Sequence, residues 1–419
     1  MRIFWLELKR ILKTRRIFVM LSASVILSVL MACMAVQGVE YNDPTARQLI
    51  GGRAAVDALN KEDNDAYVGP VTVEKLRQAL KTCRDVYQKY GQNVPADVYR
   101  RKIVPIQRLL DAMLAVYFPN GNNGGYQNLS TLNPNRLKNF YTQRFEVIKG
   151  TLESQYPGNQ SVLRQAEQLN EKSAIPFSFA KGDPGGTTMS LTFLAFVLVA
   201  IGAMITAPNF AAEYQSGADD ILRSTKHGRG RFAVAKLCAP LVLLAAMFAV
   251  CALIFILLVN PTVGWNSFQV SVQLSLPTNC LAPLNFLQAQ FATLLAALLS
   301  LLATACLSLF FSTKCRSSTT ALILSITIFM LPIMLEVIVE SGGNIGGNGM
   351  AVLAYALPGG VVGLQGSFYG HLLGVSRFSF VKIGPWAVWV PDLMLGACIV
   401  EIPVFFLLAA HAYCRHQAA

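Results

Sequence analysis

Six long apolar runs divide the chain, and they dominate its pattern of hydrophobic and polar positions. Each contains at most two charged residues and is long enough to cross a bilayer, which takes about 20 helical residues at about 1.5 Å each. The runs cover residues 17–39, 187–207, 237–259, 284–311, 319–339 and 387–410. They predict an all-α polytopic membrane protein with six transmembrane helices.

Residues 1–16, ahead of the first run, have the pattern of an amphipathic helix. One face is apolar and the opposite face is basic. The apolar face holds Phe4, Trp5, Leu8, Ile11 and Leu12, and the basic face holds Arg2, Lys9, Lys13 and Arg16. A basic amphipathic helix leading into a span is typical of the membrane interface. The alternative is a positively charged topology signal without interfacial structure.

Residues 40–186 are the only long polar segment, with 19 basic and 15 acidic residues. Apolar positions recur there with helical spacing, from Leu76 to Tyr90 with Gly91 as a stop signal. The same spacing runs from Tyr141 to Leu152, in a helix predicted to begin at Asn133-Pro134. We predict a helical domain between the first and second spans.

The charge distribution predicts the topology. The chain is 53% apolar and 14% charged, with a net charge of +12. Fourteen of the Lys and Arg residues outside the polar domain flank the spans on one side, and only Arg377 and Lys382 flank them on the other. By the positive-inside rule both termini are cytoplasmic, including the 411–419 tail, and residues 40–186 are extracellular. The basic charge therefore does not indicate a nucleic-acid partner.

The loop at residues 208–236 is rich in charge although both flanking runs have none. Its first part, from Glu213 to Leu222, is predicted to form a short helix with apolar positions at Tyr214, Ala218 and Ile221. A basic stretch then returns to Lys236 at the start of the third span. A plain connector is the alternative interpretation.

This loop resembles the ABC-2 type permeases, the transmembrane subunits of ABC transporters. The matching residues are Phe210, Glu213, Gly217, Leu222, Ser224, Thr225, Arg229 and Lys236. The resemblance includes the six spans and the N-terminal helix, with an enlarged first extracellular loop. It implies a coupling helix that docks on an ATPase subunit. The implied coupling residues are Glu213, Tyr214, Gly217, Asp219, Leu222, Ser224 and Thr225.

The sequence indicates no catalytic, cofactor or metal site of its own. A phosphate-binding P-loop needs a Gly-Lys dipeptide, which the chain does not contain. ATP and Mg would therefore be bound by the partner ATPase. The four histidines, His227, His371, His411 and His416, are too scattered to indicate a metal site. The sequence does not decide whether Cys83 and Cys280 form a disulfide.

Three acidic residues in or near the apolar runs are candidates for an intramembrane or vestibule role. Glu401 lies near the middle of the sixth run, where a carboxylate is costly and faces a cavity, the bundle interior or a partner. It is either linked to substrate or conformation, or a protonated acid bonding between helices. Glu336 and Glu340 share one helix face. They line an outer vestibule for cationic cargo or, as we favour, lie at a solvated helix end.

Residues 341–386 are apolar but broken by Gly and Pro, which predicts a re-entrant or interfacial segment on the outer side.

Together with the resemblance, these features predict a permease subunit of an ATP-driven transporter in a bacterial inner membrane. The resemblance implies that the direction of transport is export. An amphipathic or hydrophobic cargo (a peptide, a lipid-like molecule or a drug) suits the uncharged spans. The expected partners are ATPase subunits, lipids, and a second copy or a related permease. The alternatives are an ion-coupled transporter using Glu401 and Glu336, and a non-transporting sensor or scaffold.

Overall fold

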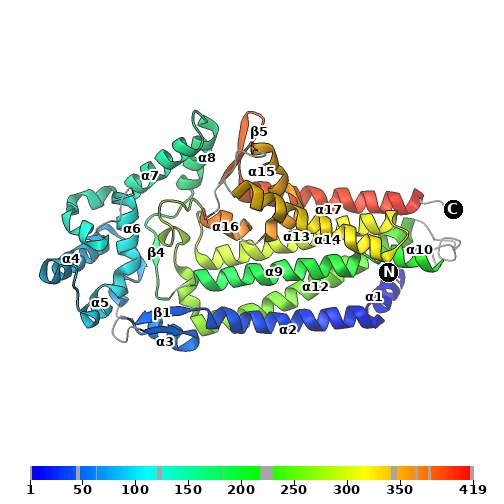
Figure 1. The fold of residues 1–419 in the computed structure, drawn as a ribbon, viewed down its shortest axis with the longest axis horizontal. Helices are drawn as coiled ribbons and strands as arrows, with labels where there is room; N and C mark the ends of the chain where they lie inside the picture. Colours follow the sequence, from blue (N-terminus) through cyan, green and yellow to red (C-terminus); the bar gives the residue numbers. More distant parts are fainter. Residues whose placement is uncertain are drawn as a thin grey trace.

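The fold is built on a bundle of six long helices (Figure 1). The computed structural model describes residues 2–43, 48–62, 64–119, 125–182, 184–217, 230–340, 347–363, 367–375 and 379–415. Within these residues six helices are long and apolar enough to cross a membrane. They are α2 (Arg15–Gln37), α9 (Gly185–Thr206), α12 (Gly230–Val263), α13 (Phe286–Lys314), α14 (Ser318–Glu340) and α17 (Val390–Arg415). The predicted class, an all-α polytopic membrane protein, is confirmed.

The ends of the long helices differ from the apolar runs by a few residues. The helix α13 begins at Phe286 because Asn285 and Gln288 form a capping box, in which each side chain accepts a hydrogen bond from the other residue's backbone N–H, at 2.8 and 3.0 Å. The helix α12 begins at Gly230, well before the predicted start at residue 237. Lys236 therefore lies inside a helix rather than at the end of a loop.

The N-terminal helix α1 (Arg2–Lys13) is separated from α2 by a single residue, Thr14. Its apolar side chains are divided between two environments. Ile11 is buried against the bundle, whereas Trp5 and Leu6 are exposed. The helix contacts both α12 and α2, so the amphipathic stretch is a packed part of the fold.

Residues 40–184, between α2 and α9, form a separate lobe at one end of the bundle, which we call the head (Figure 1). It contains mainly short helices with two small antiparallel sheets, β1–β2 and β3–β4. Its elements are β1 (Glu40–Asp43), β2 (Gln48–Gly51), α3 (Gly52–Asn60), β3 (Gly69–Pro70), α4 (Val73–Tyr90), α5 (Ala96–Lys102), α6 (Gln107–Tyr117), α7 (Phe140–Gln155), α8 (Gln160–Glu171) and β4 (Ser178–Phe179).

Local signals explain the ends of two helices in the head. The hydroxyl of Thr72 caps α4 by accepting a hydrogen bond from the Lys75 N–H, and Gly91, at φ +59°, ends that helix where the sequence predicts. The second predicted helix begins later than expected. A 3-10 helix occupies Pro134–Asn139, and α7 begins only at Phe140.

The segment between α14 and α17 packs back into the bundle. It contains α15 (Gly347–Ala356), α16 (Phe368–Leu373) and the hairpin of β5 (Phe380–Ile383) and β6 (Trp386–Trp389). The carbonyl of Pro358 accepts a hydrogen bond of 2.6 Å from the hydroxyl of Ser300, which lies midway along α13. This chain segment therefore reaches halfway down a span.

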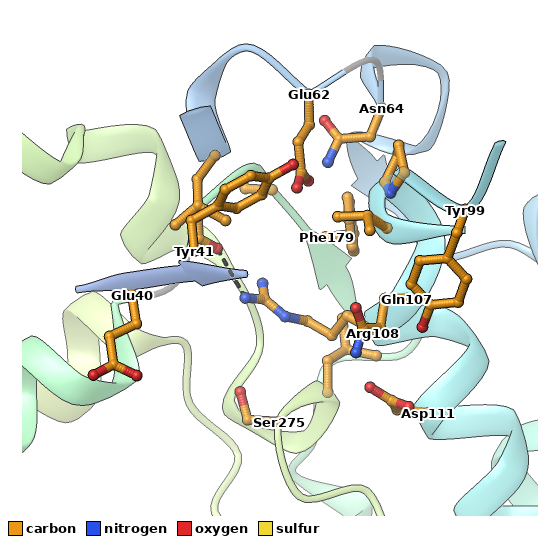
Figure 2. Close-up of a pocket in the computed structure, with 16 residues that line it drawn as sticks. Glu40, Tyr41, Glu62, Asn64, Tyr99, Gln107, Arg108, Asp111, Phe179 and Ser275 are labelled. Atoms are coloured by element: carbon orange, nitrogen blue, oxygen red, sulfur yellow. Dashed lines mark hydrogen bonds between the residues drawn. The ribbon is translucent and has the colours of Figure 1, made fainter. Parts of the chain in front are cut away.

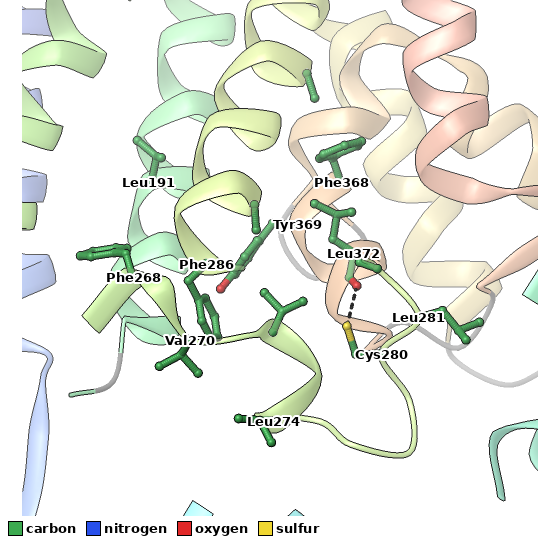
Figure 3. Close-up of a cluster of buried hydrophobic side chains, with 14 of the residues drawn as sticks. Leu191, Phe268, Val270, Leu274, Cys280, Leu281, Phe286, Phe368, Tyr369 and Leu372 are labelled. Atoms are coloured by element: carbon green, nitrogen blue, oxygen red, sulfur yellow. Dashed lines mark hydrogen bonds between the residues drawn. The ribbon is translucent and has the colours of Figure 1, made fainter. Parts of the chain in front are cut away.

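Buried apolar side chains fill the junction between the head and the bundle (Figure 3). They come from the loop between α12 and α13, from the start of α13 and from α16, and include Phe268, Phe286 and Leu372. Backbone and side-chain hydrogen bonds between Ser178 and Ser271, at 2.8 and 2.9 Å, join the end of the head to the same loop. The head is thus attached to the bundle by packing as well as by the chain.

Candidate functional site

The short helix α10 (Ala211–Ser216) follows α9 after a four-residue turn. Its first turn is fixed to α13, because the hydroxyl of Ser312 accepts hydrogen bonds from the N–H groups of Phe210 (2.9 Å) and Ala211 (3.1 Å). The helix ends at Gly217, which takes a left-handed conformation with φ +71°. The prediction of one helix from Glu213 to Leu222 is therefore wrong, since Gly217 ends the helix within it.

Glu213 on α10 is buried and bound by two cations from other helices. Arg10 of α1 and Lys236 of α12 each donate a hydrogen bond to one of its carboxylate oxygens. Arg10 also forms an ion pair with Glu7, with 2.7 Å between Nη2 and Oε2. One carboxylate thus joins α10 to both the N-terminal helix and the third span.

The environment of Lys236 compensates for its complete burial. Its Nζ lies 4.5 Å from the ring centre of Phe210 and 5.6 Å from that of Phe232, and these aromatic faces attract a cation. The side-chain amide of Asn209 donates a 3.2 Å hydrogen bond to the Lys236 carbonyl. The ammonium group is therefore held between a carboxylate and two rings.

An apolar cluster surrounds this ion pair and reaches the last span, α17. The rings of Phe210 and Tyr413 lie 5.1 Å apart, which links the start of α10 to the end of α17. The buried members of the cluster are Phe210, Phe232, Ala233, Leu237, Leu309, Ala409 and Tyr413. Tyr214 packs at its edge, half-buried. A displacement of α10 would therefore act on α1, α12, α13 and α17 together.

The structure places part of the predicted coupling site. Glu213, Tyr214 and Gly217 belong to α10 and its end. The other predicted members, Asp219, Leu222, Ser224 and Thr225, lie outside the described residues.

Two charged residues of this site, Arg10 and Lys236, were not predicted as site residues. The local sequence could have identified Lys236, because it immediately precedes a long uncharged run, where a Lys side chain needs a buried partner. Arg10 had no such signal, since it lies in the N-terminal helix but is not among the residues of the predicted basic face. Its contact with Glu213 spans 203 positions.

The intramembrane acids lie in different surroundings. Glu336 is only 4% exposed, and its Oε2 packs so closely on Gly363 that an added Cβ would approach it to 2.5 Å. The favoured interpretation of a solvated helix end is therefore wrong for Glu336. Glu401 is half-buried, and no described residue donates a hydrogen bond to its buried Oε2. Glu340 lies in the last turn of α14, but its side chain is outside the described residues.

A mainly apolar groove of about 580 Å³ lies beside Glu213. Its walls come from α2, α9 and α14, through residues that include Met20, Met204 and Leu322. Arg10, Arg16 and Glu213 also line it. The groove therefore combines a mainly apolar surface with three charged side chains.

The described residues contain no group of three or more His, Cys, Asp or Glu side chains that could hold a metal ion. All nine cysteines are free. The thiol of Cys83 approaches the Tyr126 carbonyl at 3.7 Å, and that of Cys280 approaches the Leu372 carbonyl at 3.3 Å. The structure therefore has no Cys83–Cys280 disulfide.

Comparison with known proteins gives one match. The family model for ABC-2 family transporter proteins matches residues 1–354, which is most of the chain. Neither the curated proteins nor the solved structures contained a match. The chain therefore belongs to the ABC-2 transporter family, as a multi-pass transmembrane subunit of an ABC transporter.

Proposed function

We propose that a separate ATPase drives this subunit through the segment at residues 208–236, and that the subunit exports an amphipathic or hydrophobic cargo. The observation that carries the proposal is the position of Glu213. Its carboxylate joins α10 to α1 and α12 in one buried cluster. A push on α10 would be distributed over several helices at once, which is what an energy-accepting element needs.

The distribution of charge supports a cytoplasmic position for this end of the bundle. Helix α1 and the end of α17 lie there, opposite the head (Figure 1). The basic residues beside the ends of the spans gather at the same end, among them Arg15, Arg16, Lys314 and Arg415. Under the positive-inside rule this end faces the cytosol of a bacterial cell and the head lies outside.

The groove beside Glu213 supports the proposed class of cargo. Its apolar walls suit a hydrocarbon chain or an apolar peptide, and Arg10 and Arg16 in its lining suit a polar end group. Amphipathic peptides, lipid-like molecules and drugs all combine an apolar part with a polar group. Outward transport is proposed from the family resemblance.

The remaining parts of the transporter are proposed to be supplied by other chains. ATP and Mg would be bound by the ATPase subunits, which would dock at α10 and the chain that follows. A second copy of this subunit, or a related permease, would complete the pathway. The exposed apolar residues of α2 and α14, such as Phe18, Ile26, Ile323 and Met334, are available to such a partner and to lipid.

Photocrosslinking in cells tests the docking. A photoreactive amino acid at exposed Ser216, at the end of α10, should crosslink to an ATPase subunit, and the yield should change when ATP is depleted. The same probe at exposed Glu153 in the head is the control and should give no such product. Products with lipid alone, or transport by the purified chain under a proton gradient without an ATPase, would contradict the proposal. The latter result would favour an ion-coupled transporter.

A further inference from the structure

The base of the head contains a pocket of about 490 Å³ that the proposed coupling does not use (Figure 2). Its walls include β1 directly after α2, residues 179–182 just before α9 and residues 274–275 between α12 and α13. The head supplies the rest, through the end of α3 and the loop that follows it, α5, residues 104–105 and α6. The volume is within the usual range for small-molecule sites. The pocket lies where the head meets the connections to four spans.

The charged residues that line the pocket are mainly acidic. Glu40, Glu62 and Asp111 are carboxylates, and Arg108 is the one lining cation among the described residues. Two of these groups are already engaged. Arg108 donates a 2.8 Å hydrogen bond to the Gly182 carbonyl, and Asp111 accepts one of 2.5 Å from the hydroxyl of Tyr126.

Glu62 and Asn64 have hydrogen-bonding capacity left over. Glu62 Oε1 and Asn64 Oδ1 are buried, and neither accepts a hydrogen bond from a described residue. Asn64 as a whole is only 3% exposed. Figure 2 shows the two side chains next to each other on one side of the pocket, opposite Arg108. Buried acceptors are nearly always satisfied, so this pair indicates a ligand that brings donors.

The rest of the lining suits the apolar part of such a ligand. Tyr41, Tyr99 and Phe179 contribute aromatic side chains, and aromatic faces attract organic cations. A metal ion fits less well, since the described residues hold no cluster of three metal-ligating side chains. An anion would meet three carboxylates and a single guanidinium that already donates to a carbonyl.

We propose that this pocket binds an organic cation, a primary amine or guanidinium, with Glu62 and Asn64 accepting its N–H groups. An ammonium group has donors and no acceptor, which matches the two unsatisfied oxygens. Its hydrocarbon part lies against the aromatic residues. Because the walls adjoin α2 and α9, an occupied pocket connects the outer ends of these two helices through the head.

The site also explains an electrostatic feature of Glu62. Burial raises the pKa of its carboxyl to about 7, although Arg108 and Lys181 act in the opposite direction. A bound cation would add to the positive charge of Arg108 and Lys181 and so favour the ionised carboxylate. Ligand binding and ionisation of Glu62 should therefore favour each other.

Calorimetry on the purified full-length chain in nanodiscs tests the proposal. The probes are phenethylamine and a capped Gly-Lys-Gly peptide, each compared with its N-acetylated form, which keeps the skeleton but loses the charge. Binding of either amine, in preference to its acetylated form, supports the site. The probe that binds more tightly, phenethylamine or the peptide, indicates whether the natural cation is a free amine or a peptide side chain.

Variants connect binding to the named residues. Glu62→Gln should weaken binding about tenfold or more, the usual effect of losing a charge-assisted hydrogen bond. Glu62→Asp, which keeps the charge, should retain part of the affinity, and Glu153→Gln at an exposed site in the head should retain all of it. Equal binding of the acetylated probes, no binding of either amine, or unchanged affinity in Glu62→Gln would overturn the proposal. The assay contains no ATPase, so its result is independent of the proposed coupling.

Discussion

Glu213 on α10 and Lys236 on α12 form a buried ion pair across 23 positions of the chain, on opposite sides of the charged loop. The pair closes the loop at its base. It also sets the register between the end of the second span and the start of the third. Arg10 binds the other carboxylate oxygen, so the N-terminal helix is fixed by the same residue.

Breaking this pair should be costly. Removing one partner of a buried ion pair leaves the other charge uncompensated, at a cost of about 3–5 kcal/mol. Lys236→Met leaves Arg10 as the partner of Glu213, so we expect it to lower the unfolding free energy of the detergent-solubilised chain by up to about that amount. Lys9→Met, which removes an exposed Lys from α1, is the matched control and should change stability by less than about 0.5 kcal/mol.

The double variant distinguishes charge pairing from loss of packing. If the two charges stabilise each other, Glu213→Gln combined with Lys236→Met should cost at least about 1 kcal/mol less than the sum of the single changes. Strict additivity would mean that the pair does not couple energetically.

The ATPase rate of the assembled transporter should also respond to Arg10→Ala. This change removes the contact between Glu213 and the N-terminal helix α1, and so loosens α1.

The six spans could be predicted from the sequence because a lipid environment requires long uncharged runs, and such runs are local. The end of α4 at Gly91 was predictable for a similar reason, since a glycine after helical periodicity is a local signal. Gly217 carries the same signal, but the apolar spacing from Glu213 to Leu222 favours a single helix that continues through it, so the spacing hides this helix end.

The contacts of the two sites could not be predicted in this way. Glu213 was identified, but its partner Arg10 lies in another helix 203 positions away, and nothing in the local pattern relates them. The pocket at Glu62 and Asn64 is formed by β1, by α3, α5, α6 and their connections in the head, and by two loops next to the spans. Only the packing of the head on the bundle brings these segments together.

Gly359 allows the segment after α15 to approach α14 closely. A Cβ at this position would overlap the Phe329 backbone carbonyl and come within 2.9 Å of Pro332 Cγ, and neither backbone nor ring can move easily. We expect Gly359→Ala to destabilise the chain by about 1–3 kcal/mol.

Gly349→Ala is the matched control for that substitution. Gly349 lies in α15, and an added Cβ there has no neighbour within 4 Å. Alanine should therefore be neutral, or stabilising by up to about 1 kcal/mol through its helix propensity. Thermal unfolding of both variants checks the pair, and equal effects would show that Gly359 is not held against α14.

Tyr156 connects the head to the hairpin that precedes α17. Its hydroxyl donates to the Phe380 carbonyl at 3.0 Å and accepts from the Phe380 N–H at 3.3 Å. Tyr156→Phe should cost about 1–2 kcal/mol and speed amide hydrogen exchange in β5. Tyr90→Phe, a change at a half-buried residue on α4 away from the hairpin, should leave that exchange rate unchanged. Unaltered protection of β5 in Tyr156→Phe would show that the hydroxyl does not hold the hairpin.

Glu62 should make the stability of the chain fall as the pH rises. In the unfolded chain this carboxyl has its ordinary pKa of 4.5, whereas burial raises the folded value to about 7. Between these values the folded chain holds the proton more tightly, so the stabilisation is full below pH 4.5 and is lost as the pH approaches and passes 7. The charged and titratable groups around Glu62 are Glu40, Tyr41, Tyr99, Arg108, Asp111 and Lys181.

Glu62→Gln isolates this contribution from that of its neighbours. The variant cannot ionise at position 62, so its unfolding free energy should vary less than that of the natural chain between pH 5 and 7.5, in denaturant titrations. Adding phenethylamine should reverse part of the loss in the natural chain, because a cation favours the ionised carboxylate, and should have no such effect in the variant. Parallel pH profiles for the two chains would mean that Glu62 titrates at its ordinary pKa. In that case the pocket would lack the buried, unpaired carboxylate on which cation binding depends.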